Sequence, residues 1–197
     1  MSAVETLRRH APAVGDAEIE KLSAYVDLLL RWNAKINLTA ARTVDDAMQH
    51  VIDCLAVVGH VPPTAVRLVD VGAGGGLPAV VIAILRPTLH VTAVEPIHKK
   101  HAFLRTAARE LGLPNLNPIA ARLEDLPDAD WDVATSRATF ALDEWLRDGV
   151  RLVRPGGWVL GLEGADEVAL PPGAQRHPYP LGNRKRAIVS LQRPFED

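Results

Sequence analysis

The sequence predicts a doubly wound α/β fold with a mostly parallel sheet, an N-terminal helical extension and a C-terminal antiparallel hairpin. The first reason is that short apolar runs alternate with helical patterns from Val66 onward, as in βαβ units. The second is a glycine-rich turn directly after the first of these runs. The third is size, because 197 residues, 48% of them hydrophobic, are enough to bury one core.

Two helices are expected before the sheet. Asp16 is expected to cap the first, and Thr43 with Asp46 three residues later forms a capping-box pattern at the start of the second. We therefore predict that residues 1–63 form a helical extension packed on the core. Residues 64–197 are predicted to form the α/β domain, and the two parts to make a single globular unit.

The remaining elements are predicted from apolar runs and from the glycines and prolines between them. Strands are expected at 66–71, 89–94, 116–121, 131–136, 157–162, 174–181 and 186–193, the last two joined around Gly182-Asn183. Helices are expected at 77–86, 97–111 and 139–153, the second ending at Gly112 as C′ residue and the third at Pro155-Gly156-Gly157.

The composition excludes several classes of protein. A net charge of −2 gives no overall attraction to nucleic acid, so any RNA contact must be local. No run approaches the roughly 18 apolar residues of a membrane span and no signal-peptide core is present, so we expect a cytoplasmic protein. Cys54 is the single cysteine, and no zinc-type Cys/His spacing occurs, so neither an internal disulfide nor a metal is expected.

Three basic patches could contact RNA, although ordinary solvated charge also explains each of them. They are Arg8-Arg9, Lys99-Lys100 with Arg105 and Arg109, and Arg184-Lys185-Arg186.

The glycine turn runs from Asp70 to Leu77 and includes Gly72 and Gly74, which let the backbone approach a nucleotide-like ligand. Taken alone, such a turn also fits a simple connection between a strand and a helix. Glu95 ends the next strand, roughly 20 residues further on, where its carboxylate could accept both hydroxyls of a ribose. The alternative for Glu95 is an acid in the first turn of a helix.

Two details favour S-adenosylmethionine (SAM) over a dinucleotide. Leu77 stands where the third glycine of a dinucleotide loop is expected, and the Asp70 carboxylate would repel a pyrophosphate but attract a cationic amino group and a sulfonium. Glu124 or Asp125 could accept the exocyclic amine of adenine, although a polar turn explains them equally well. Arg137, at the end of the fourth strand, is expected at the opening of the cofactor or acceptor site. The alternative for Arg137 is a surface ion pair.

The chain resembles the bacterial small-subunit (16S) ribosomal RNA methyltransferase G family, also called glucose-inhibited division protein B. The resemblance spans nearly the whole chain, and its W-N-x-x-x-N-L-T-A segment is highly specific. It is carried by Arg31-Trp32-Asn33 with Asn37-Leu38-Thr39-Ala40, His50 with Ile52-Asp53, the loop from Asp70 to Pro78, Lys99-Lys100 with Phe103-Leu104, Arg122-Leu123-Glu124, and Ser136-Arg137-Ala138.

The resemblance implies a Rossmann-like fold that binds SAM and transfers its methyl group to N7 of a guanine in the decoding-region loop of 16S rRNA. It implies 16S rRNA or a small-subunit precursor as partner, and we expect a monomer that needs neither membrane nor metal. The residues that it assigns to the SAM pocket are Gly72, Leu77, Leu123, Glu124 and Arg137.

Guanine N7 carries a lone pair and no proton, so its methylation requires alignment with the methyl donor and no general base. We therefore nominate no catalytic acid or base. Cytosine C5 methylation uses a cysteine nucleophile, and Cys54 is expected to be a buried structural thiol. Amino-group methylation commonly uses an Asn/Asp-Pro-Pro-aromatic cluster after the fourth strand, where this chain has Ser136-Arg137-Ala138.

Contacts to RNA are expected from five polar side chains, Lys99, Lys100, Arg105, Asn33 and Asn37. Both asparagines are expected to be exposed, whereas Trp32 beside them is expected to pack in the core. His50 and Asp53 lie three apart on a helix, are expected to bond each other or solvent, and are left outside the site.

Departures from the family pattern leave other functions open. Glu163-Gly164 stands where the family usually has Lys-Gly, Ser190-Leu191-Gln192 where its final strand often ends in lysine, and Leu77-Pro78-Ala79 where its loop ends in Pro-Gly. One alternative is a SAM-binding, ribosome-associated module without turnover. A small-molecule methyltransferase is another, and a nicotinamide oxidoreductase comes last.

Overall fold

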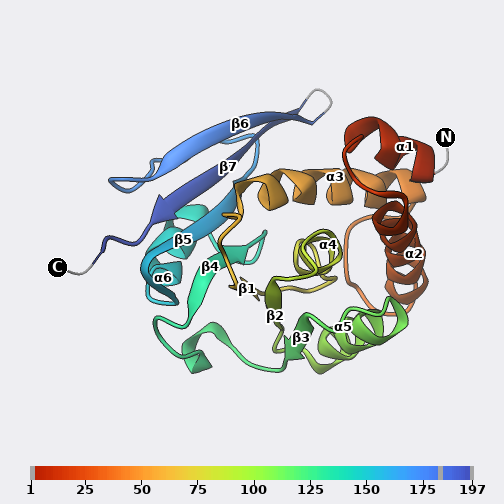
Figure 1. The fold of residues 1–197 in the computed structure, drawn as a ribbon, viewed down its shortest axis with the longest axis horizontal. Helices are drawn as coiled ribbons and strands as arrows, with labels where there is room; N and C mark the ends of the chain where they lie inside the picture. The colour runs from red at the N-terminus through yellow and green to blue at the C-terminus, as the bar shows by residue number, and fades with distance from the viewer. Residues whose placement is uncertain (1–2, 182–183, 196–197) are drawn as a thin grey trace.

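The computed structural model describes residues 3–181 and 184–195, which build a seven-stranded sheet in the order β3-β2-β1-β4-β5-β7-β6 (Figure 1). β1 to β5 run parallel, β7 is antiparallel to β5, and β6 is antiparallel to β7. The strands are β1 (Arg67–Val71), β2 (His90–Val94), β3 (Leu116–Ile119), β4 (Trp131–Ser136), β5 (Val153–Glu163), β6 (Gln175–Leu181) and β7 (Arg184–Gln192). The predicted doubly wound sheet with a C-terminal hairpin is confirmed.

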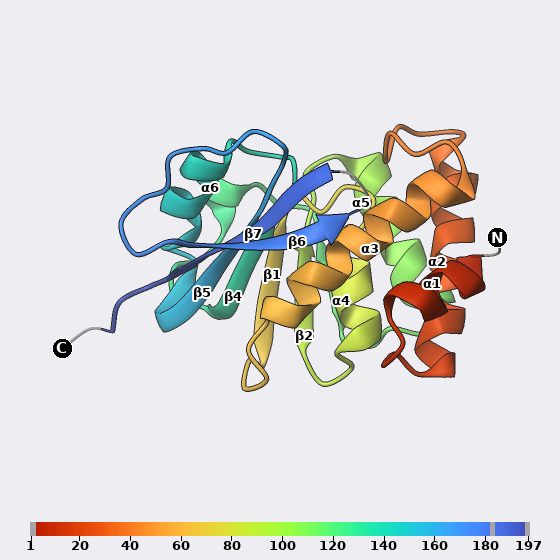
Figure 2. The same ribbon diagram turned by 90° about the horizontal axis from the view of Figure 1, so that it is seen from above.

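Helices cover both faces of this sheet. They are α1 (Ala3–His10), α2 (Asp16–Asn33), α3 (Val44–His60), α4 (Ala79–Leu85), α5 (His98–Glu110) and α6 (Leu142–Gly149), with a single 3-10 turn, η1 (Leu123–Asp125). Alternate residues of β1 serve opposite faces: Leu68 packs in the core under α2 to α5, and Val69 packs in a second core under α6. This alternation is the period of two that a strand buried on both sides requires (Figure 2).

The N-terminal helices pack on the sheet side occupied by α4. Tyr25 of α2 is fully buried, and its hydroxyl donates a 2.5 Å hydrogen bond to the carbonyl of Gly75 in the turn after β1. The C-terminal hairpin extends towards α3 (Figures 1 and 2), where the Tyr179 hydroxyl of β6 donates a hydrogen bond to the Asp53 carboxylate. The division of the chain at residue 63 stays a prediction.

Several predicted boundaries were wrong. Helix α1 was not predicted, and Gly15, rather than Asp16, is the N-cap of α2, with no side-chain cap. The helix expected at 139–153 is shorter, since α6 covers only Leu142–Gly149. Pro155-Gly156-Gly157, expected to end that helix, lies within β5. The reason is a bulge, since pairing with β4 passes from Trp131↔Val153 directly to Val133↔Trp158.

Other local predictions hold. Gly112 follows α5 with φ +59°, the left-handed conformation of a C′ glycine. The hairpin turn predicted at Gly182-Asn183 lies outside the described residues. In the described part of the chain, no helix is long and apolar enough to cross a membrane, and no group of three or more His, Cys, Asp or Glu side chains could hold a metal ion.

The capping box of α3 provides a test of local stability. The Thr43 hydroxyl accepts the Asp46 N–H at 3.1 Å, and the Asp46 carboxylate accepts the Thr43 N–H at 3.1 Å. Thr43→Ala should lower the free energy of unfolding by about 1 kcal/mol, because a first-turn N–H loses its partner. Urea denaturation measures this change. Thr106→Ala is the control, since the Thr106 hydroxyl only bonds a carbonyl within its own helix and its loss should leave stability within about 0.5 kcal/mol. Equal effects of the two variants would contradict the capping role.

Candidate functional site

The turn after β1 brings the backbone close to the carboxyl ends of β2 and β4. Gly72 has φ +75°, and a Cβ built on it would lie 2.3 Å from the Thr139 hydroxyl oxygen. The amides of Gly72 and Ala73 both donate to the carbonyl of Val94, at 2.9 and 3.0 Å. A side chain at position 72 would therefore be excluded both by backbone conformation and by space.

Glu95 lies directly below this turn and is 4% exposed. One carboxylate oxygen accepts the Gly74 N–H at 2.9 Å, and the other accepts the Ile97 N–H at 2.9 Å. The side chain therefore fixes both the glycine turn and the start of the segment that leads into α5. Each oxygen retains further acceptor capacity, so the ribose contact expected for Glu95 stays a prediction.

Asp70 is a fully buried carboxyl group in β1, just before the turn. Its Oδ2 accepts the Ala79 N–H at 3.0 Å, whereas its Oδ1 is buried and has no hydrogen-bond partner among the described residues. Burial raises the pKa of Asp70 to about 7. An orphaned acidic oxygen of this kind is suited to a cationic group, so the residues present fit the ammonium end of SAM.

Two cavities meet around Gly72 and Thr139, and we call them together the cofactor cleft. A cavity of about 360 Å³ includes Ile97, Leu123 and Glu124, and one of about 330 Å³ includes Gly74, Leu77, Lys100 and Arg137. All five residues that the resemblance assigns to SAM thus lie around one cleft, with Asp70 in β1 and Glu95 directly after β2. Asp125 instead closes η1, where its carboxylate accepts the Arg122 N–H.

Arg137 stands between this cleft and a neighbouring cavity, and its side chain is 16% exposed. Its Nη1 lies 3.5 Å from Asp53 Oδ2, 3.4 Å from the His50 carbonyl oxygen and 3.7 Å from Cys54 Sγ. The pairing is therefore buried, not the surface ion pair that was the alternative. Cys54 is fully buried as expected, and burial raises the pKa of its thiol to about 12.

Both His50 and Asp53 line the neighbouring cavity, and Asp53 pairs with Arg137 rather than with His50 or solvent alone. An available signal was the position of Asp53 within the apolar face of its helix, since a buried carboxylate needs a cationic partner. Phe140 and Arg186 also line this cavity and were not singled out as site residues.

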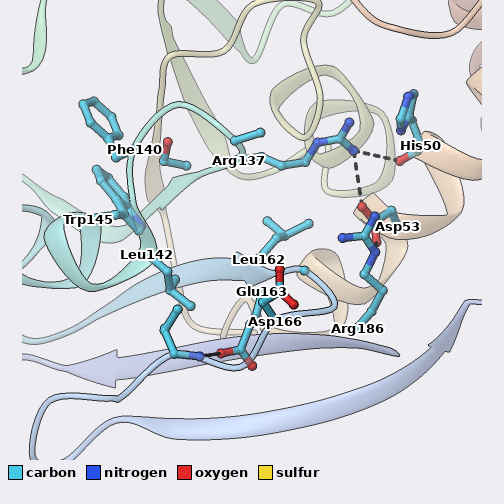
Figure 3. Close-up of a pocket in the computed structure, with 14 residues that line it drawn as sticks. His50, Asp53, Arg137, Phe140, Leu142, Trp145, Leu162, Glu163, Asp166 and Arg186 are labelled. Atoms are coloured by element: carbon cyan, nitrogen blue, oxygen red, sulfur yellow. Dashed lines mark hydrogen bonds and ion pairs between the residues drawn. The ribbon is translucent and has the colours of Figure 1, made fainter. Parts of the chain in front are cut away.

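This neighbouring cavity of about 410 Å³, the acceptor cavity, opens at the carboxyl ends of β4 and β5 (Figure 3). Glu163, which replaces the family's usual lysine, is 3% exposed in its wall. Arg176 donates to both of its oxygens at 2.5 and 2.9 Å and lowers the pKa of Glu163. Glu163 is therefore neutralised by Arg176, a residue that does not itself line the cavity.

The five side chains predicted to contact RNA differ in how exposed they are and in what they face. Lys99 and Arg105 are exposed on α5, and the partly exposed Lys100 faces the cofactor cleft. Asn37 is exposed, but the expectation of an exposed Asn33 was wrong. Its side chain bonds the Ala41 carbonyl at 2.7 Å and the Leu38 and Thr39 amides at 2.9 and 3.0 Å, because the loop after α2 needs these partners to fold back. Trp32 is half-buried against Phe103.

Comparisons with known proteins identify the family. The family model described as rRNA small subunit methyltransferase G matches residues 18–191. The ribosomal RNA small subunit methyltransferase G of Leptothrix cholodnii is 41% identical over 169 residues, which cover 81% of this chain and 78% of that protein. The protein of the same name from Burkholderia ambifaria is 39% identical over 196 residues, covering 94% and 82%.

The solved structure of the S-adenosylmethionine-dependent methyltransferase SibL, in its apo form, matches with a TM-score of 0.62 at 18% identity, over 98% of this chain and 74% of that chain. At this identity the likeness concerns the fold alone. The family match and the two relatives span most of this sequence, and the cleft described above fits the same ligand. The chain therefore belongs to the rRNA small subunit methyltransferase G family, with S-adenosylmethionine as its cofactor.

Proposed function

We propose that this protein transfers the methyl group of SAM to N7 of a guanine in the decoding-region loop of 16S rRNA. The substrate is 16S rRNA or a precursor of the small ribosomal subunit, and the protein acts in the cytoplasm as a monomer. The observation that carries the proposal is the buried, unpartnered Asp70 oxygen beside a cleft that opens, across Arg137, on a second cavity at the strand ends. Substrates of open α/β sheets bind at this edge.

In this proposal, different residues contact different parts of the cofactor. Asp70 holds the amino group of the methionine part, Glu95 accepts from the ribose, and Leu123 with Glu124 contacts the adenine. When bound, SAM supplies an electrophilic methyl group on a sulfonium. Apolar walls at Val71, Val94 and Phe140 exclude water from the adenine side of the cleft.

No proton has to be removed from guanine N7, so the chain's contribution is to position the base and to stabilise charge. Burial, followed by the nearby Arg137 charge, lowers the pKa of His50, and the imidazole is neutral at pH 7. Arg137 is thus the cation shared by the cleft and the acceptor cavity. Lys100 adds a second positive charge on the cleft side.

A module that binds SAM without turnover is the second candidate, and the replacement of a family lysine by Glu163 is the observation that favours it. The pairing of Glu163 with Arg176 weakens this argument, because the carboxylate is already neutralised. A small-molecule methyltransferase would bind an acceptor in the same 410 Å³ cavity. The first prediction below separates the rRNA methyltransferase from these two alternatives.

Label from methyl-labelled SAM should appear at a guanine N7 of unmodified small-subunit particles or of naked 16S rRNA. Arg137→Ala should reduce this transfer by more than tenfold, because its guanidinium lies between the two cavities. Arg154→Ala is the control, since Arg154 is exposed on β5 and pairs with Asp132. Binding of SAM without label in any rRNA form would contradict the rRNA methyltransferase function and favour the other two.

The affinity for SAM should rise with pH between 5.5 and 7. Since burial holds the pKa of Asp70 at about 7 in the free protein, the carboxyl is mostly protonated at pH 5.5, and a cationic ligand must displace its proton. Affinity should therefore increase on the order of tenfold over this interval. Isothermal titration calorimetry measures the dependence. In Asp70→Asn the affinity should be lower and independent of pH, and an unchanged slope in that variant would refute the assignment.

A further inference from the structure

The acceptor cavity has two chemically different ends (Figure 3). Phe140 and Trp145 lie at one end, and Arg137, Arg186 and Asp53 at the other. An aromatic surface suits a nucleobase, and a pair of guanidinium groups suits a phosphate. The cavity thus combines both chemical features of a nucleotide.

The aromatic end is rigid. The Phe140 and Trp145 rings stack with centroids 5.8 Å apart and an interplanar angle of 14°. Trp145 is 2% exposed, and its indole N–H donates to the Leu160 carbonyl at 2.9 Å, so it is a fixed support. Phe140 is partly exposed and lines both the acceptor cavity and the adenine side of the cofactor cleft. A base stacked on this ring would lie next to the cofactor.

The cationic end is incompletely satisfied. Asp53 receives a hydrogen bond from Tyr179 and is shared by two arginines, at 3.5 Å from Arg137 and 3.9 Å from Arg186. Charge-assisted hydrogen bonds are usually about 2.8 Å long, so both pairings are loose. The Nε of Arg186 is buried and has no hydrogen-bond partner among the described residues. Two guanidinium groups around one carboxylate leave a local excess of positive charge.

Other charges around the cavity do not remove this excess. Glu163 is neutralised by Arg176, and His50 is neutral because burial lowers its pKa. Asp166 belongs to the exposed loop after β5, on the opposite side of the cavity from Arg137 (Figure 3). As a hydrogen-bond acceptor it suits the N–H groups of a base, and as an anion it disfavours a phosphate on that side. The favourable place for a phosphate is between Arg137 and Arg186.

We propose that the acceptor cavity receives a single RNA nucleotide turned out of its strand, with the base stacked on Phe140 and a phosphodiester held by Arg186 together with Arg137. This inference rests on the proposed function and deepens it. It assigns a phosphate-binding subsite to Arg186 and a base platform to Phe140. Asp53 pairs only loosely with the two arginines and is displaced from them in part when the phosphate binds.

Arg186 is tested by the salt dependence of RNA binding. Binding of unmodified 16S rRNA to Arg186→Ala should be about tenfold weaker than to the wild type. The slope of log affinity against log salt should fall by about one, as for a lost phosphate contact. Arg154→Ala, an exposed arginine on the same sheet, should change neither quantity by as much. An unchanged slope in Arg186→Ala would overturn the subsite.

Asp53→Asn separates phosphate binding from a purely structural ion pair. If Arg186 only satisfied Asp53, this variant would weaken RNA binding as Arg186→Ala does, and that result would overturn the proposal. We expect instead an RNA affinity at or above that of the wild type and an unchanged slope, because both arginines remain available. Thermal melting should first show that both variants are folded. RNA binding is then compared only between proteins that pass this test.

The platform is tested by the ring at position 140. Phe140→Leu should lower kcat/KM for rRNA about tenfold, since a stacked base loses its aromatic partner, and Phe140→Tyr should restore most of the rate. The loss in kcat/KM should exceed any loss of SAM affinity, measured separately as a Kd, because leucine and tyrosine both keep an apolar wall on the adenine side of the cleft. Equal rates in Phe140→Leu and wild type, or no rescue by tyrosine, would overturn the platform. If even the wild-type protein transfers no methyl group, the proposed function fails, whereas the RNA-binding test of Arg186 still gives an answer.

Discussion

The close approach of the glycine turn to its neighbours is the constraint on which the rest of the site depends. Residues 72–76 have no room for side chains at Gly72 and Gly76, where a Cβ would lie 2.3 Å from Thr139 and 2.4 Å from Val80 respectively. The turn is fixed from below by the Glu95 carboxylate and from the helical side by the Tyr25 hydroxyl. Because of this, α2, the end of β2 and the start of α4 are all positioned relative to one backbone segment.

A second interaction joins the N-terminal helices to the hairpin. Asp53 on α3 contacts Arg137 from the end of β4, and Tyr179 and Arg186 from β6 and β7. Removing a buried partner from such a group leaves a charge without compensation, which generally costs several kcal/mol. The N-terminal helices therefore do more than cover the sheet, since one of them supplies the carboxylate that holds the arginine between the two cavities.

The position of Glu163 shows how the surroundings change the meaning of a substitution. Read in the sequence, an acid in place of a family lysine argues against an RNA substrate. In the fold, Arg176 from β6, which is separated from β5 by β7, donates to both of its oxygens, so the reversal of charge is largely cancelled. Asn33 is a related case, since it was expected to be exposed and to contact RNA but instead holds the loop at residues 38–41.

The sequence by itself determined the parallel sheet, the glycine turn, the acids at the ends of β1 and β2 and the capping box of α3. Local periodicity and short motifs specify these features, because the interactions involved lie within one element or at the carboxyl ends of adjacent strands. It did not determine helix α1, the bulge that draws residues 155–157 into β5, or the roles of Asp53, Phe140 and Arg186. These features arise from contacts between segments far apart in the chain, such as Asp53 and Tyr179. Only the tertiary structure decides which charged side chains are neutralised by a partner and which face a cavity. Burial and pairing both depend on the packing of several elements at once.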